Sequence, residues 1–216
     1  DLDTPELAIA NAMREARRMA AVTRLMLVQA FGGLLRISTK PFGTVVKNEA
    51  VVDMMKDSTN DYLAQIAARK LSTRQAILLQ HLMVTVADLE RIGDHVESIT
   101  ELTQQKVANH VWFDQESMRL LVDQYLRVDR LLRLTILSLD PELRAFKQIS
   151  DKMLELRREF VVANRDLRSR YRQLIIEHHE TSLNGLYYDQ FLRIFERVVR
   201  HTKSIARLEQ TAFFNV

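Results

Sequence analysis

Residues 87–97 read Ala-Asp-Leu-Glu-Arg-Ile-Gly-Asp-His-Val-Glu and form the most informative segment of the chain. It lies inside a long helical pattern whose apolar residues share one stripe: Leu82, Leu89, Ile92 and Val96. A second stripe, more than a quarter-turn away, carries acidic residues: Glu90, Asp94, Glu97 and Glu101. Carboxylates spaced one helical turn apart repel each other. We therefore expect them either to face water or to share a cation.

The composition predicts a fold made of few, long helices. The chain of 216 residues has only five Gly and three Pro, which leaves little material for the many turns of a β-rich fold. No strand-like alternation of apolar and polar residues persists along the chain. The sequence therefore predicts an all-α protein.

Capping and breaking signals predict six helices. We expect the first helix to fray at Gly32-Gly33, and we expect a turn at Asn184-Gly185. The predicted helices cover approximately residues 4–31, 45–68, 72–107, 114–139, 142–180 and 187–212.

The third and sixth predicted helices suggest an internal repeat. Residues 89–95, Leu-Glu-Arg-Ile-Gly-Asp-His, align with residues 195–201, Phe-Glu-Arg-Val-Val-Arg-His, so that Glu, Arg and His recur at matching places. We predict two tandem antiparallel three-helix bundles with short connections, one in residues 1–110 and one in residues 111–216.

Two pairs of acidic residues form the candidate binding site. Glu49 and Asp53 share one edge of the second helix, and Glu90 and Asp94 share one edge of the third. If these helices are antiparallel neighbours, the four carboxylates can converge, and oxygen-only ligands suit hard cations. The alternative is a set of solvated acids on an exposed face, and the spacing alone leaves both readings open.

The segment Leu89–His95 resembles the most recognisable segment of the PhoU family of phosphate-signalling proteins. That family's metal motif is an acidic residue, three other residues and then Asp, and both Glu49–Asp53 and Glu90–Asp94 resemble it. The resemblance implies that Glu49, Asp53, Glu90 and Asp94 bind a metal ion, with Fe, Mn, Mg, Ca and Zn all open. It also implies a PhoU-like arrangement of the two bundles.

The second half departs from the family's motif. Arg200 stands where the motif would have Asp, and its guanidinium beside Glu196 would form a salt bridge in place of a metal site. We therefore expect one metal-type bundle and one degenerate bundle.

The beginning of the chain resembles one branch of the family. Leu2–Ala8 followed by Glu15–Met19 is similar to the opening of the C-terminal PhoU-like domain of bacterial sodium/phosphate cotransporters, and a first residue other than Met fits that expectation. This resemblance implies a regulatory domain on the cytoplasmic side of the inner membrane, with the membrane portion of the same chain as its partner.

Two other functions remain open. One is a stand-alone cytoplasmic PhoU-type regulator of phosphate uptake and starvation signalling, which would act on a phosphate transporter complex. The other is a metal-binding helical bundle with enzymatic activity. The sequence also leaves open whether the protein forms a homodimer.

Several functions are disfavoured by the sequence itself. The net charge is +3 and the arginines are spread along the helices, so we expect no nucleic-acid partner. There is no Gly-rich phosphate loop, nucleophile elbow or Cys, so we expect no catalytic residues and no enzyme. No apolar run approaches the roughly 18 residues of a membrane span. Trp112 and Phe113 fall between the bundles, where they serve either packing or an interaction surface.

Overall fold

The described residues of the computed structural model, 4–177 and 182–214, form six α-helices and no strand. The all-α prediction is therefore confirmed. The helices are α1 (Pro5–Arg36), α2 (Phe42–Ala67), α3 (Thr73–Ala108), α4 (Gln115–Ser138), α5 (Phe146–Glu177) and α6 (Ser182–Phe214).

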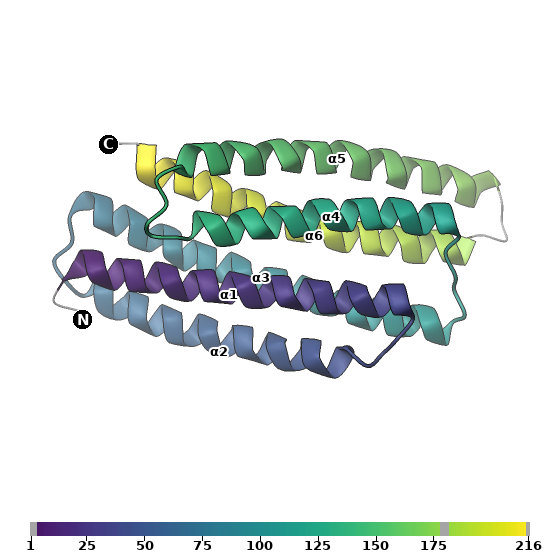
Figure 1. Ribbon diagram of the computed structural model, residues 1–216, viewed down its shortest axis with the longest axis horizontal. Helices are drawn as coiled ribbons and strands as arrows, with labels where there is room; N and C mark the ends of the chain where they lie inside the picture. The colour runs from purple at the N-terminus through teal and green to yellow at the C-terminus, as the bar shows by residue number, and fades with distance from the viewer. Residues whose placement is uncertain (1–3, 178–181, 215–216) are drawn as a thin grey trace.

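The helices lie nearly parallel to one long axis, in two groups of three (Figure 1). Helices α1, α2 and α3 contact one another, and α4, α5 and α6 do the same. The two groups meet where α3 packs on α6 and α1 packs on α4, so α2 and α5 lie on the outside of the described molecule. This arrangement is the pair of three-helix bundles that the sequence predicts.

Local capping chemistry fixes where several helices begin. Ser72 closes a capping box with Gln75, in which each side chain accepts a hydrogen bond from the other residue's backbone N–H. Asp114 caps α4 by accepting a hydrogen bond from the backbone N–H of Ser117. Pro5 occupies the first turn of α1, where a missing N–H costs nothing. All three starts agree with the sequence signals.

Two predicted breaks are wrong. Gly32 and Gly33 lie within α1, which continues to Arg36 and ends at Ile37 in the left-handed conformation. Asn184-Gly185 lies within α6, where Asn184 donates a hydrogen bond from its side chain to the carbonyl of Trp112. In both places tertiary packing outweighs the weak local preference of Gly and Asn for turns.

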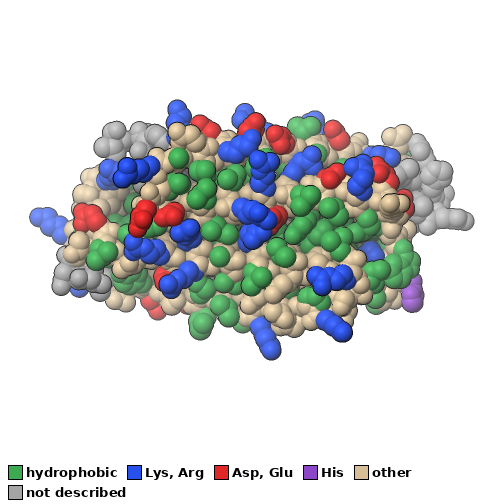
Figure 2. All heavy atoms as spheres, in the orientation of Figure 1, with side chains coloured by type: hydrophobic (Ala, Val, Ile, Leu, Met, Phe, Trp, Pro, Cys, Tyr) green, Lys and Arg blue, Asp and Glu red, His purple; other side chains and the backbone are tan. Residues whose placement is uncertain are grey.

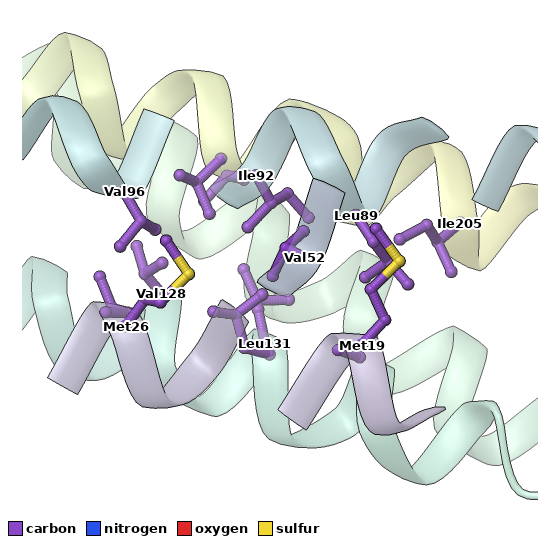
Figure 3. Close-up of a cluster of buried hydrophobic side chains, with 14 of the residues drawn as sticks. Met19, Met26, Val52, Leu89, Ile92, Val96, Val128, Leu131 and Ile205 are labelled. Atoms are coloured by element: carbon purple, nitrogen blue, oxygen red, sulfur yellow. The ribbon is translucent and has the colours of Figure 1, made fainter. Parts of the chain in front are cut away.

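The two groups of helices share one apolar core. Figure 3 shows side chains from α1, α3, α4 and α6 meeting there, and Val52 reaches the same cluster from α2. Met19, Met26, Leu89, Ile92 and Val128 are almost completely buried in it. Burial of apolar surface, which contributes about 25 cal/mol per Å², is the main stabilising term of such a bundle.

Further contacts join the two halves. Asp129 on α4 is almost fully buried and accepts hydrogen bonds from Arg24 on α1, at 2.8 Å and 3.4 Å. Phe31 on α1 stacks on Tyr125 on α4 with ring centroids 4.1 Å apart. Phe113, in the connection before α4, packs edge-on against Tyr188 of α6. Phe113 thus serves packing, whereas Trp112 is 49% exposed.

Helix α1 is long and apolar enough to span a membrane, whereas the sequence analysis expected no such segment. Half of the residues in its apolar window are buried inside the protein, and the helix packs against α2, α3 and α4. We therefore interpret α1 as a core helix, since the central helices of large bundles are apolar for the same reason.

Candidate functional site

Three of the four predicted metal ligands come together between α2 and α3. Glu49 and Asp53 on α2 and Asp94 on α3 each place one carboxylate oxygen within 4.8 Å of the others. Glu49 is half-buried, and Asp53 and Asp94 are exposed. Two antiparallel helices thus bring residues far apart in sequence into one carboxylate cluster.

The close approach of the two helices depends on small side chains. Gly93 on α3 is buried, and a Cβ at this position would lie 3.5 Å from Cγ1 of Val52 on α2. Val52 itself is 1% exposed. Because Gly93 adds no side chain of its own to this contact, α3 can approach α2 closely enough for the carboxylates on either side to share one site.

Glu90, the fourth predicted ligand, makes a different interaction. Its carboxylate accepts a hydrogen bond from Nζ of Lys56 on α2 at 2.7 Å. Hydrogen bonding to Glu90 raises the pKa of Lys56. Glu90 therefore borders the cluster but already has a cationic partner, which the spacing of acids along the sequence could not indicate.

The electrostatics of the cluster favour a bound cation. Burial and then the charges of Asp53, Glu97 and Asp94 raise the pKa of Glu49 to about 7. Burial and the charge of Glu90 raise the pKa of Asp94 as well. Like charges held together disfavour ionisation, and a divalent cation would reverse both effects.

Glu97 is an additional acidic residue near this cluster. It lies one turn beyond Asp94 on α3, and burial followed by the charges of Glu101, Asp94 and Asp53 raises its pKa. The sequence places it on the acidic stripe of α3, but the family's five-residue motif does not include it. The other acids of α2, Asp57 and Asp61, are exposed and lie outside the carboxylate cluster.

The second half lacks such a cluster within the described residues. Glu196, the counterpart of Glu90, accepts a hydrogen bond from Arg168 on α5 at 2.9 Å. Arg168 also donates to Asp189 at 2.7 Å. The partner of Glu196 is thus Arg168 from the neighbouring helix, whereas the sequence suggested Arg200. Lys56–Glu90 and Arg168–Glu196 are equivalent ion pairs in the two halves.

The fold and this site define a class: an all-α protein of two three-helix units, with a carboxylate cluster in the first unit and an arginine-based ion pair at the equivalent place in the second. Residues 16–103 match the family model described as PhoU domain. The matched segment lies in the first half of the chain and includes both acidic motifs.

Solved structures show the same fold over the whole chain. The chain is similar to PhoU from Pseudomonas aeruginosa, with a TM-score of 0.80 and 15% identity over 99% of this chain and 100% of that one. It is also similar to the phosphate transport system regulatory protein PhoU from Streptococcus pneumoniae, with a TM-score of 0.82 and 14% identity over 99% and 98%.

A more distant similarity connects the chain to a putative PhoU-like phosphate regulatory protein from Shewanella oneidensis MR-1. The TM-score is 0.59 and the identity is 8%, over 99% of this chain and 100% of that one. No curated protein matches the sequence significantly. At these identities the structural likeness shows the PhoU fold and not a shared site.

Proposed function

We propose that this protein is the cytoplasmic regulatory domain of a sodium-dependent phosphate transporter. The observation that carries the proposal is the PhoU domain in residues 16–103, within a fold that follows PhoU regulators over 99% of the chain. The similarity of Leu2–Ala8 and Glu15–Met19 to the opening of cotransporter domains supports the transporter context. The role is regulatory: the domain transmits phosphate status to the membrane portion.

A divalent or trivalent cation at Glu49, Asp53 and Asp94 is part of this proposal. The cluster offers only carboxylate oxygens, which suits a hard cation. When bound, such an ion supplies a fixed positive charge. The protein's own contribution is to hold two carboxylates on α2 and one on α3, so that neutralising their repulsion ties the two helices together.

The stand-alone regulator is the second candidate. The similar Streptococcus pneumoniae protein is a phosphate transport system regulatory protein, and that chain and this one cover each other almost completely, which favours this candidate. In this case the partner would be a separate phosphate transporter complex and the protein would be cytoplasmic.

The coding sequence upstream of the Asp1 codon discriminates between the two candidates. Several apolar segments of about 20 residues there would support the cotransporter, because each is long enough to span a bilayer. A start codon directly before Asp1 would overturn the cotransporter proposal in favour of the free regulator.

A transport assay tests the regulatory role itself. In cells that depend on the encoded transporter, deletion of residues 1–216 should change phosphate-dependent control of uptake while transport persists. Purified protein that hydrolyses phosphoesters would instead favour the enzymatic bundle.

A further inference from the structure

The counterpart of the carboxylate cluster in the second half is a pocket lined by arginine. A cavity of about 200 Å³ lies between α5 and α6, and the residues around it are Val161, Asn164, Arg165, Arg168, Arg172 and Glu196. Glu196 is its only acidic lining residue, so the pocket carries net positive charge.

The two equivalent ion pairs identify this pocket as the counterpart of the acidic cluster. Matching Lys56 with Arg168 aligns α2 with α5. The residue at the position of Glu49 is then Val161, and the residue at the position of Asp53 is Arg165. Arg200 occupies the position of Asp94 on α6. Each of the three carboxylates is replaced, one by an apolar side chain and two by guanidinium groups.

Two of the pocket arginines retain most of their donors. Arg165 has a 3.8 Å ion pair with the adjacent, exposed Asp166. Arg172 donates from Nε to the backbone carbonyl of Arg168. The remaining N–H groups of both side chains have no other described partner.

The base of the pocket supplies a buried polar group. Asn164 is 3% exposed, and its side-chain oxygen lies 3.4 Å from Nε2 of the fully buried Gln124, which donates to it. This leaves the amide nitrogen of Asn164 as a donor at the pocket wall. Asp189 and Glu196 hold the Arg168 guanidinium in place beside this donor.

We propose that the pocket between α5 and α6 binds an oxyanion of the phosphate class. Planar guanidinium groups bind phosphate oxygens in pairs, and charge-assisted hydrogen bonds of this kind are the strong ones. Arg165 and Arg172 contact the anion and Asn164 donates from below, whereas Arg168 is paired with Asp189 and Glu196 and forms the pocket wall. A volume of about 200 Å³ accommodates one phosphoryl group, free or attached to a small molecule.

Inorganic phosphate, titrated into the purified chain and followed by calorimetry, tests this proposal. EDTA in the buffer removes metal ions, so phosphate held by a cation at the carboxylate cluster does not contribute. We expect saturable binding of one phosphate per chain. Glu49→Gln should leave it unchanged, which separates this site from the cation site proposed above.

Paired variants identify the pocket. The double variant Arg165→Gln/Arg172→Gln should weaken phosphate binding by roughly tenfold or more, because it removes two charge-assisted partners. Arg170→Gln is the matched control: Arg170 lies on the same helix and is exposed, but it does not line the pocket. Glycerol 3-phosphate, titrated in parallel, distinguishes an esterified phosphoryl group from free phosphate.

Tighter binding of phosphate than of glycerol 3-phosphate assigns the site to the free anion, and the reverse assigns it to a phosphate ester. Absence of saturable binding of both ligands would overturn the proposal. An equal loss of affinity in Arg170→Gln would also overturn it, because the attraction would then be a general effect of net charge.

Discussion

The imidazole rings of His95 on α3 and His201 on α6 stack on each other, with centroids 5.5 Å apart. These two residues occupy equivalent places in the repeat, and the helices that carry them run antiparallel, since Asn109 lies beside Tyr187 at the other end of the contact. An approximate two-fold axis therefore passes between the rings. Nδ1 of His201 also lies 2.8 Å from Asp88, which has no counterpart acid in α6.

This relationship explains how one architecture can carry two opposite sites. The two three-helix units pack against each other through α3 and α6, while α2 and α5 remain on the outside. Each outer helix packs only on its own half among the described residues, so its exposed edge can change charge without disturbing the shared core. The first half presents carboxylates there and the second presents guanidinium groups.

The first prediction concerns cation binding by the carboxylate cluster. Glu49→Gln and Asp94→Asn should each weaken Mn²⁺ binding by at least roughly tenfold, because even indirect metal partners are worth about 10- to 100-fold in affinity. Calorimetric titration and metal analysis of the purified protein measure this. Glu90→Gln is the control and should retain most of the Mn²⁺ binding, since the Glu90 carboxylate is already paired with Lys56. Unchanged metal content in both Glu49→Gln and Asp94→Asn would show that the cluster does not bind the metal.

The second prediction is a pH dependence of stability in the absence of metal. The pKa of Glu49 is raised from 4.5 to about 7, chiefly by burial and then by Asp53, Glu97 and Asp94. Between these pH values the folded state keeps a proton that the unfolded state has lost, so stability falls as pH rises through this window. Urea unfolding with EDTA at pH 5 and pH 8 measures the fall, and Glu49→Gln should reduce it. An added divalent cation should restore stability at pH 8.

The sequence predicted the helical parts of this structure well because its signals are local. Ser72, Asp114 and Pro5 act within one turn of the chain, and the 3.6-residue period of apolar residues marks the buried faces directly. The wrong breaks at Gly33 and Gly185 have the opposite origin. Both residues lie inside helices that contacts with other segments hold together, and a single sequence does not display such contacts.

The candidate site was only partly predictable for the same reason. The five-residue motif located Glu49, Asp53 and Asp94, because residues one turn apart share a helix edge. It could not show that Lys56 would turn toward Glu90, since Lys56 belongs to no acidic pattern and its rotamer depends on the facing helix. Arg168 was missed likewise: its pairing with Glu196 follows from the register of α5 on α6.

The third prediction concerns a buried imidazole in α3. Both ring nitrogens of His81 are buried without a described hydrogen-bond partner, and burial lowers the pKa of His81 below its usual 6.5. The unfolded state therefore takes up a proton first as the pH falls through 6.5, and stability is lost. His81→Leu should raise the free energy of unfolding by about 1 kcal/mol at pH 8 and by more at pH 5. A variant less stable than the parent at both pH values would contradict this account.

The fourth prediction compares two buried glycines. A Cβ on Gly33 would lie 2.9 Å from the Phe42 ring and 3.0 Å from the backbone oxygen of Ser38, so Gly33→Ala should destabilise the protein by about 1–3 kcal/mol. A Cβ on Gly93 would meet Val52 at an ordinary 3.5 Å. Gly93→Ala should therefore be neutral or gain up to about 1 kcal/mol from helix propensity. Thermal and urea unfolding of the two variants measure this difference in stability. If helix propensity alone determined the effect, both variants would change stability in the same direction.

The fifth prediction is that the two halves unfold together. Phe31 is 1% exposed, stacks on Tyr125, and lies 6.0 Å from the ring of Phe195, so its side chain joins both halves. Phe31→Ala should cost about 3–5 kcal/mol through lost burial and a cavity. Because the core is shared, amides in the outer helices α2 and α5 should lose hydrogen-exchange protection by similar factors. Val162→Ala, at an exposed position of α5, is the control and should change neither helix. Loss of protection confined to α2 would show that residues 1–110 and 111–216 behave as independent domains.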